Sequence, residues 1–184
     1  MNLPSLPYNL EQSLIDKIKH IKLALFDVDG VLTDGKLHYG PNGEEMKVFH
    51  ALDGHGLKML QMAGIDVGII SARRSTALQT RLNDLGIKHD YLGVNDKLDV
   101  FKSLQDQLGI DNAQCAFTGD DVIDLEVMQA CGTKFSVENG HFIVKNIADW
   151  VAPLTGGNGA VRAICDVILY CQNNYPLSTS HSVQ

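Results

Sequence analysis

Apolar and polar residues along the chain fall into blocks of strand length and helix length. Residues 21–28, IKLALFDV, form a mostly apolar run that ends in acidic residues, as is typical of a central strand covered on both faces. Residues 10–20 instead carry apolar side chains at helical spacing, and Asn9 before them is a suitable N-cap. The pattern predicts a first helix over residues 10–20 and a buried strand over residues 21–28.

The alternation of strands and helices continues to residue 172. Further strands are predicted at residues 66–70, 89–92, 115–118, 133–137 and 150–152. Helices are predicted after the Asp53-Gly54 pair and at residues 75–85, 96–108, 121–131, 141–147 and 158–172. This order implies βαβ units with right-handed crossovers. The predicted fold class is α/β, with a Rossmann-like, doubly wound parallel sheet.

Two short strand-like runs interrupt this order after the first strand. Residues 36–39 and 45–49 flank the turn sequence Gly40-Pro41-Asn42-Gly43, which predicts a β-hairpin. The length of 184 residues suits one domain. We therefore predict a single domain over residues 1–184, with a core at 21–172, a hairpin flap at 36–49 and a flexible tail at 173–184.

Composition and charge narrow the class of protein. The net charge of -7 argues against nucleic acid or an anionic membrane surface as the main partner. The acidic residues are 17 Asp and only 5 Glu, and Asp favours loops, caps and cation sites over helix interiors. The four cysteines form no C-x-x-C pair, and no signal-like apolar run opens the chain. Reduced thiols in a cytoplasmic protein are therefore expected.

Polar residues follow the predicted strands at the edge where parallel strands end. Asp27 and Asp29 follow the first strand, Ser71 and Arg73 the second, and Lys97 the third. The fourth is followed by Asp120, Asp121 and Asp124. Ligands of doubly wound sheets bind at this edge. The carboxylates, the hydroxyl and the cations are thus expected to lie around one site.

The chemistry of these residue types fits phosphoryl transfer. Asp27 and Asp29 are two positions apart, so both point to one side of an extended backbone, and one can be a nucleophile while the other is an acid and base. Asp120 would crowd this site with negative charge, which Mg²⁺ would offset. Ser71 can donate to a phosphoryl oxygen, and Lys97 can neutralise charge. Asp121 and Asp124 also occupy positions where helix caps occur.

These residues resemble the four motifs of the haloacid dehalogenase superfamily of phosphotransferases. The resemblance covers residues 21–172 and rests on DVDGVLTD at 27–34, Ser71, Lys97 and GDDVID at 119–124. Longer stretches are similar to phosphatases that act on the 8-phosphate of an eight-carbon keto sugar acid in lipopolysaccharide sugar synthesis. Those stretches are DVDGVLTDG at 27–35, NGEEMKVFHALDGHGLKML at 42–60, GDDVIDLEVM at 119–128 and GGNGAVRAICDVIL at 156–169.

The resemblance implies a role for each matching residue. Asp27 is the implied nucleophile and Asp29 the implied acid and base, with Ser71 and Lys97 also catalytic. Asp27, the backbone carbonyl of Asp29, and Asp120 would hold Mg²⁺, supported by Asp121 and Asp124. Implied substrate contacts come from Asp29, His50, Ala51, Leu52, Asp53, Gly54, Lys58, Arg73, Arg81 and Lys97.

The spacing of the implied contacts and the lengths of the segments between the motifs add further predictions. Arg73 and Arg81 are eight positions apart, which predicts that they share one face of a helix. Ala72 stands where the family usually has Gly. Only 44 positions separate Asp27 from Ser71, and 26 separate Ser71 from Lys97, which leaves no room for a large cap domain. The resemblance implies a homotetramer in which hairpins and C-terminal tails of neighbours complete each site.

Several other functions remain open from the residues. The same chemistry could act on a nine-carbon sialic-acid-type phosphate, or an uncapped site could admit a phosphoprotein. A phospho-accepting signalling domain also combines Asp, Ser or Thr, Lys and Mg²⁺, but there the acceptor lies on the third strand. Here the candidate acceptor Asp27 follows the first strand and Asp29 follows it closely, which favours turnover. A non-catalytic regulatory module would lack one of these two residues.

Overall fold

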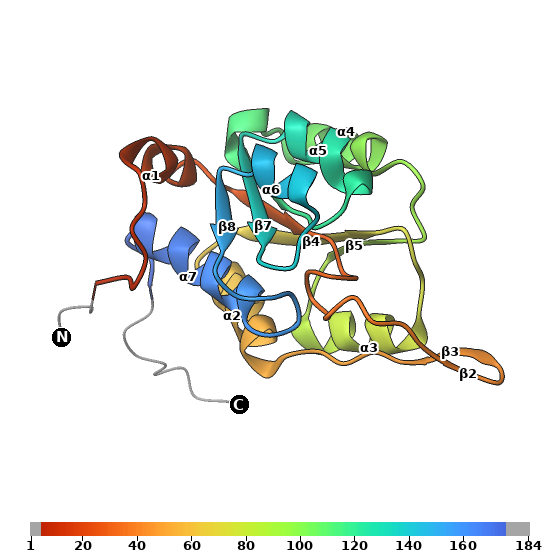
Figure 1. Cartoon of the computed structure of the whole chain (residues 1–184). Coiled ribbons are helices and arrows are strands. Elements are labelled where there is room, and N and C mark those ends of the chain that lie inside the picture. Colours follow the sequence, from red (N-terminus) through yellow and green to blue (C-terminus); the bar gives the residue numbers. More distant parts are fainter. Residues whose placement is uncertain (1–4, 176–184) are drawn as a thin grey trace, which may run out of the picture.

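A parallel sheet of six strands forms the centre of the computed structural model, which describes residues 5–175 (Figure 1). The strand order is β5-β4-β1-β6-β7-β8. Their bounds are β1 Leu23–Phe26, β4 Asp66–Ser71, β5 His89–Leu92, β6 Cys115–Thr118, β7 Thr133–Val137 and β8 Trp150–Ala152. From β1 the chain passes outward through β4 and β5, and then returns to β6 on the other side of β1. This reversal of direction opens a crevice beyond the carboxyl ends of β1 and β6.

Helices cover both faces of the sheet, as a doubly wound fold requires (Figure 1). One layer holds α2 Ala51–Met62, α3 Thr76–Leu85 and α7 Ala160–Cys171, and the other holds α4 Lys97–Leu108, α5 Leu125–Ala130 and α6 Phe142–Ile147. Helix α1, Gln12–Ile18, packs against α7 and β7. A hydrophobic cluster lies under each layer. The predicted fold class is confirmed.

The central strand shows why the sequence folds in this way. All four residues of β1, LALF, are buried, with side chains that alternate between the two hydrophobic clusters. Each buried Leu or Phe contributes about 1.5 to 3 kcal/mol relative to exposure. Because both faces are covered, apolar residues are required at every position, and the strand is rigid where it delivers Asp27.

Several element ends differ from the sequence prediction. Helix α1 begins at Gln12 after Glu11, whose side chain makes no cap hydrogen bond, so Asn9 as its N-cap was wrong. Helix α2 begins at Ala51, which puts Asp53 and Gly54 in its first turn rather than before it. The helix expected over residues 121–131 is two pieces, a 3₁₀ turn η2 Val122–Asp124 and then α5. A second 3₁₀ turn, η1 Asn112–Gln114, precedes β6.

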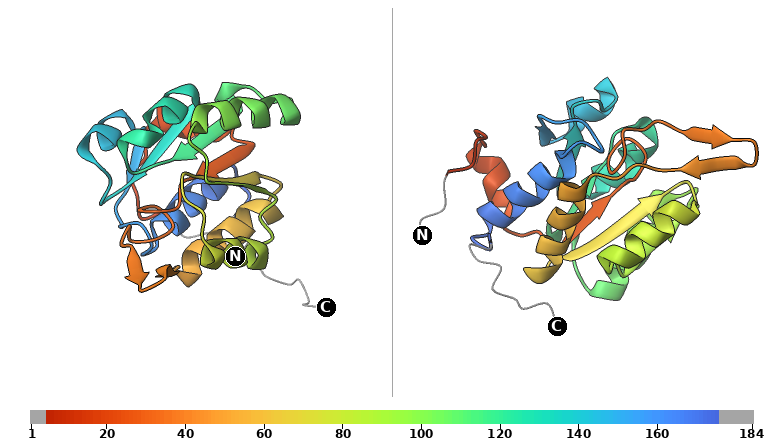
Figure 2. Two further views of the ribbon diagram at one scale, coloured as in Figure 1. Left: turned by 90° about the vertical axis from the view of Figure 1, so that its right-hand side faces the viewer. Right: turned by 90° about the horizontal axis from the view of Figure 1, so that it is seen from below.

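The predicted hairpin is present as a separate two-stranded sheet. Strands β2 His38–Gly40 and β3 Gly43–Met46 pair antiparallel around Pro41-Asn42, so both lie within or near the expected runs but are shorter. The hairpin projects beyond the body of the molecule (Figures 1 and 2). Within residues 5–175 it is the inserted element between β1 and α2, and no large cap domain accompanies it.

The ends of the chain bear on two further expectations. Of the tail expected at residues 173–184, residues 176–184 lie outside the described part. All four cysteines lie within residues 5–175, where each is a buried free thiol. In the same residues, no helix has the length and apolar character needed to cross a membrane.

Candidate active site

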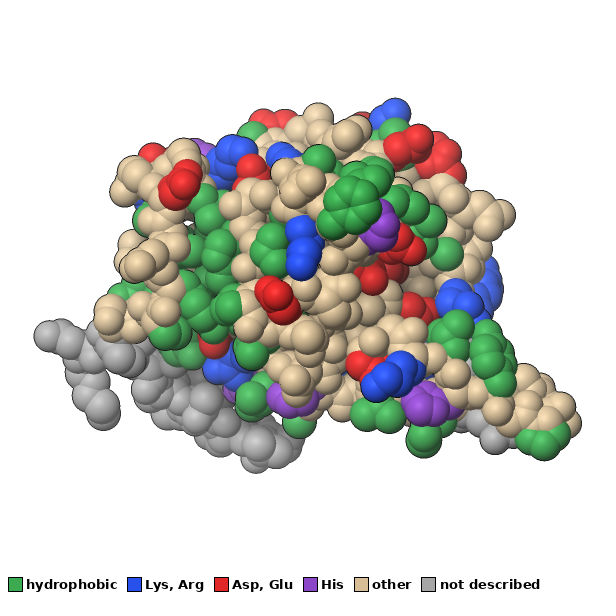
Figure 3. All heavy atoms as spheres, in the orientation of Figure 1, with side chains coloured by type: hydrophobic (Ala, Val, Ile, Leu, Met, Phe, Trp, Pro, Cys, Tyr) green, Lys and Arg blue, Asp and Glu red, His purple; other side chains and the backbone are tan. Residues whose placement is uncertain are grey.

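A cleft opens at the carboxyl ends of β1, β4 and β6. Its volume is about 370 Å³. Figure 3 shows acidic side chains gathered in a recess near the projecting hairpin. The residues that line the cleft are Asp27, Asp29, Gly35, Leu37, Ser71, Ala72, Arg73, Asp120, Asp121 and Ile123. Side chains from three separated segments, residues 27–37, 71–73 and 120–123, therefore meet in one place, as expected from the ends of β1, β4 and β6.

Asp27 is buried at the base of the cleft and paired with Lys97. Asp27 is only 4 % exposed. Lys97 Nζ lies 2.8 Å from Asp27 Oδ1 and 2.6 Å from Asp124 Oδ1. Burial raises the pKa of Asp27 to about 6, although the charge of Lys97 opposes this rise. Burial alone would lower the pKa of Lys97, but the charges of Asp27 and Asp124 raise it on balance. At neutral pH the pair is therefore a carboxylate and an ammonium.

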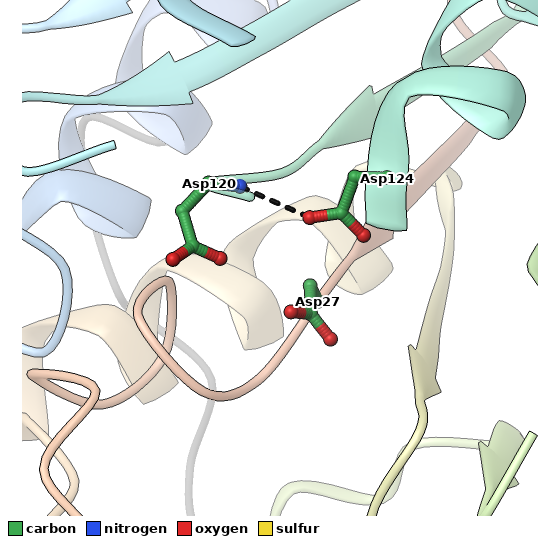
Figure 4. Close-up of side chains that lie close together, drawn as sticks. All are labelled: Asp27, Asp120 and Asp124. Carbon is green, nitrogen blue, oxygen red and sulfur yellow. Dashed lines mark hydrogen bonds between the residues drawn. The ribbon is translucent and has the colours of Figure 1, made fainter. Parts of the chain in front are cut away.

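Asp120 supplies an open oxygen beside Asp27. Asp27, Asp120 and Asp124 each offer a carboxylate oxygen within 4.8 Å of the others (Figure 4). Burial, followed by the charges of Asp27 and Asp124, raises the pKa of Asp120 to about 8. Within residues 5–175, Asp120 Oδ1 is buried and has no hydrogen-bond partner. Such a group of hard oxygen donors fits Mg²⁺, because the cation offsets their mutual repulsion.

Asp124 has a different environment from Asp120. Its Oδ1 accepts a hydrogen bond from Lys97, and its Oδ2 accepts from the backbone N–H of Asp120 at 3.1 Å (Figure 4) and of Asp121 at 3.4 Å. Asp121 in turn accepts from the backbone N–H of Val122 and starts the 3₁₀ turn. Asp124 therefore holds Lys97 and the Asp120 loop in place, while Asp120 keeps an oxygen available for a metal ion.

Gly30 provides the space that Asp120 occupies. Its φ is +98°, and a Cβ atom at this position would lie 2.0 Å from Asp120 Oδ2. We expect Gly30→Ala to weaken Mg²⁺ binding by about 10- to 100-fold, the range for changes next to a metal ligand. Isothermal titration calorimetry would measure this. Gly64→Ala is the matched control, because Gly64 has φ +81° but open space around a Cβ. Equal affinities for the two variants would contradict the role of Asp120.

Asp29 lies at the mouth of the cleft and contacts two cations. Asp29 Oδ1 accepts from Lys47 Nζ, and Asp29 Oδ2 lies 3.9 Å from Arg73 Nε. Lys47 follows β3 of the hairpin. Lys47 is not among the site residues predicted from the sequence, because a single Lys in a short hairpin carries no local pattern that links it to Asp29, 18 positions earlier.

Ser71 and Arg73 come from the loop after β4. Ser71 is 1 % exposed, and its Oγ accepts from the backbone N–H of Arg73 at 3.3 Å. Arg73 donates through Nη2 to the hydroxyl of Tyr39 in the hairpin. Helix α3 begins only at Thr76. The prediction that Arg73 and Arg81 share one helix face is therefore wrong, since Arg73 lies in the preceding loop.

Comparison with known proteins decides the family. Residues 93–164 match the family model for haloacid dehalogenase-like hydrolases. The chain is also 47% identical over 156 residues to the 3-deoxy-D-manno-octulosonate 8-phosphate phosphatase of Haemophilus influenzae, covering 85% of this chain and 87% of that protein. This chain belongs to that phosphatase family of the haloacid dehalogenase-like hydrolases. The predicted superfamily and enzyme class are confirmed.

Solved structures of the family agree in fold. The 3-deoxy-D-manno-octulosonate 8-phosphate phosphatase of Moraxella catarrhalis, in complex with a magnesium ion, a phosphate ion and a KDO molecule, has a TM-score of 0.85 and 42% identity, covering 88% of this chain and 93% of that chain. The cobalt-bound phosphatase of Haemophilus influenzae has a TM-score of 0.83 and 46% identity, covering 85% of this chain and 92% of that chain. Divalent metals thus occur in these relatives.

Several residues that the resemblance implies as substrate contacts lie apart from the cleft. Arg81 Nη2 donates to the backbone oxygen of His50 at 3.4 Å, and a Cβ at Gly54 would lie 2.1 Å from Arg81 Nη2. Lys58 is exposed on α2. Of the implied substrate contacts, all of which the structure describes, those that do not line the cleft are His50, Ala51, Leu52, Asp53, Gly54, Lys58, Arg81 and Lys97. Lys97 differs from the others, since its ammonium group contacts Asp27 directly.

Asp53 is occupied by the fold. It is 1 % exposed, and its two oxygens accept from the backbone N–H of Gly159 at 3.3 Å and of Arg162 at 2.8 Å. Gly159 is the N-cap of α7 and Arg162 lies in its first turn, where backbone N–H groups have no partners within the helix. Asp53 therefore joins α2 to the start of α7, and its contact with substrate stays a prediction.

This placement predicts a loss of stability. We expect Asp53→Ala to lower the free energy of unfolding by about 1 to 3 kcal/mol, because buried backbone donors lose a charged acceptor. Urea denaturation would measure the change. Asp106→Ala is the control, because Asp106 is exposed on α4. A variant at position 53 as stable as this control would contradict the capping role.

Proposed function

We propose that the protein is a Mg²⁺-dependent phosphatase of the cytoplasm. It hydrolyses 3-deoxy-D-manno-octulosonate 8-phosphate to the free sugar acid and inorganic phosphate, in lipopolysaccharide sugar biosynthesis. The observation that carries the proposal is the end of β1, where buried Asp27 and cleft-lining Asp29 stand two positions apart beside the open oxygen of Asp120. Family membership with octulosonate 8-phosphate phosphatases supports the choice of substrate.

In the first half of the reaction, Asp27 is the nucleophile. One carboxylate oxygen of Asp27 attacks phosphorus, and the bond between phosphorus and the sugar oxygen breaks. Asp29 gives a proton to that oxygen, so the sugar acid leaves as an alcohol. Lys97 supports this step, because its charge favours the ionised form of Asp27 against the effect of burial.

In the second half, water releases the phosphoryl group. Asp29, now a carboxylate, takes a proton from water, and the water oxygen attacks phosphorus. The bond from phosphorus to Asp27 breaks, which frees inorganic phosphate and restores the Asp27 carboxylate. Ser71 and Arg73 line the cleft and offer donors to the phosphoryl oxygens.

Asp27, Asp120 and the backbone carbonyl of Asp29 would hold Mg²⁺. The ion would neutralise negative charge where an anionic phosphoryl group meets an aspartate nucleophile. We expect excess EDTA to abolish phosphate release and added Mg²⁺ to restore it. Circular dichroism in EDTA provides the control, because the hydrophobic clusters do not depend on the metal. Full activity in excess chelator would contradict the metal assignment.

A screen of phosphate release tests the substrate. The substrates are 3-deoxy-D-manno-octulosonate 8-phosphate, a nine-carbon sialic-acid-type 9-phosphate, nucleotides and phosphopeptides. We expect the eight-carbon substrate to have the highest kcat/KM. A higher value for the nine-carbon substrate would move the assignment to that pathway, and comparable rates on sugar-acid phosphates, nucleotides and phosphopeptides would contradict a dedicated substrate.

We further propose that the active form is a homotetramer. The hairpin supports this, because Tyr39, Met46 and Val48 are exposed hydrophobic side chains on an element that projects from the body. Neighbouring subunits would exclude water from a site that has no cap domain. Analytical ultracentrifugation combined with activity assays tests this. A monomer with full activity at nanomolar concentration would contradict it.

A further inference from the structure

The side chain of Lys47 is buried although the residue lies at the base of a projecting hairpin. Its side chain is 3 % exposed, whereas Met46 and Val48 on either side are exposed. This alternation is that of an extended backbone, in which neighbouring side chains point to opposite sides. A buried ammonium group is costly unless it is paired, and Lys47 forms an ion pair with Asp29 Oδ1. The hairpin therefore delivers a cation to the cleft.

The two carboxylates of the Asp27–Asp29 pair are held by lysines of different origin. Asp27 contacts Lys97, which begins α4 in the body of the molecule. Asp29 contacts Lys47, which follows the second strand of the hairpin. The hairpin is a sheet of its own, separate from the six-stranded sheet (Figure 2). The orientation of Asp29 thus depends on an element outside the main sheet.

A second contact ties the hairpin to the same place. The hydroxyl of Tyr39 in β2 accepts from Arg73 Nη2, and Arg73 Nε lies 3.9 Å from Asp29 Oδ2. Lys47 holds Oδ1 of Asp29 by a hydrogen bond, while the distance from Oδ2 to Arg73 Nε exceeds a hydrogen bond. The two oxygens of Asp29 therefore have different surroundings. Oδ1 is hydrogen-bonded to Lys47 of the hairpin, whereas Oδ2 faces Arg73, which lines the cleft.

We propose that Lys47 is a positioning residue for the acid and base of the reaction. By anchoring Oδ1 it directs Oδ2 of Asp29 to exchange protons with the leaving group and with water. This inference rests on the proposed function, in which Asp29 performs both proton transfers. The hairpin thereby contributes to the chemistry within its own subunit.

The test compares two leaving groups in the first turnover. The alcohol of 3-deoxy-D-manno-octulosonate 8-phosphate needs a proton as it leaves, whereas p-nitrophenolate leaves without one. We expect Lys47→Met to slow the first turnover of the sugar phosphate by about 10- to 100-fold, part of the range for general acid catalysis. With p-nitrophenyl phosphate the change should stay within about threefold, because Asp29 gives no proton in that step. Lys47→Arg should recover part of the loss, since it keeps a charged donor.

Two further variants separate positioning from a general disturbance of the hairpin. Lys36→Met is the matched control, because Lys36 precedes the same hairpin but is exposed and pairs with Asp34, and it should keep both rates. When Lys47→Met is added to Asp29→Asn, the first turnover of the sugar phosphate should slow by no more than about threefold further, because the effects of two residues that act as a unit do not add. Mg²⁺ affinity should be unchanged by Lys47→Met.

Several results would overturn the inference. These are equal losses on both substrates, a full additional loss in the Asp29→Asn background, or a Lys47→Met enzyme as active as Lys36→Met. The proposed function has its own separate failure. If Asp29→Asn alone leaves the first turnover of the sugar phosphate unchanged, Asp29 is not the acid, whatever the Lys47 variants do.

Discussion

Asp27→Asn is expected to remove measurable turnover and to leave the fold intact. An amide oxygen cannot form the phosphoenzyme, and loss of a residue that acts in covalent catalysis reduces kcat by about 10⁴- to 10⁶-fold. Asn has nearly the same shape as Asp, and Lys97 keeps its 2.6 Å contact with Asp124. Phosphate release, monitored together with circular dichroism, measures both parts of the prediction.

The pKa of Asp27 adds an expectation for stability. Burial raises this pKa to about 6 from an ordinary value of 3.8, so the folded state favours the protonated form. Stability without metal should fall as pH rises from about 4 to 6, and Asn removes this cost. The Asp27→Asn protein in EDTA at neutral pH should be at least as stable to urea as the wild type.

A control and a contrary result complete this test. Asp66→Asn makes the same chemical change at an exposed carboxylate at the start of β4, at the opposite end of the strand from the cleft, and it should keep full activity. If Asp27→Asn keeps more than about a hundredth of wild-type kcat, Asp27 is not the nucleophile.

Asp29→Asn is expected to slow turnover by about 10²- to 10⁴-fold, the usual contribution of a positioned acid or base. Both halves of the reaction need this group, but an aryl phosphate needs it only in the second. Incubation with p-nitrophenyl phosphate should therefore accumulate a phosphoenzyme, seen as a burst of p-nitrophenolate and as a mass increase of one phosphoryl group. The wild type should show much less of this species.

The position of the trapped phosphoryl group is part of the prediction. Asp29→Asn combined with Asp27→Asn should show neither burst nor mass increase, because the acceptor is missing. A phosphoryl group that persists on the double variant would identify a different acceptor. A single variant with wild-type kcat on the sugar phosphate would show that another group performs the proton transfers.

Much of the fold could be predicted from local pattern. The bounds of β5, β6, β7 and β8 agree with the sequence prediction, because apolar runs of strand length were flanked by turn or helix signals. Helix starts were less accurate where side chains compete for the cap, as at Asn9 and Asp53. Whether an Asp before or within a helix caps its own helix or another one depends on packing, which a local pattern does not contain.

The candidate site, like the fold, was predicted from the sequence only in part. The sequence by itself determined that Asp27, Asp29, Ser71 and Asp120 meet around one cleft, because parallel strands bring their carboxyl ends to one edge. It did not identify Lys47, and it placed Arg73 on one helix face with Arg81, although Arg73 lies in the loop before α3.

Only the tertiary structure decided which cation faces which carboxylate. Lys97 contacts Asp27 across 70 positions, Lys47 reaches Asp29 from the hairpin, and Arg81 lies over Gly54 away from the cleft. The physical reason is that strand periodicity and helix periodicity are local and repeat along the chain. Ion pairs between distant segments depend instead on how a hairpin or a helix packs against the sheet, and they carry no period that the sequence alone would reveal.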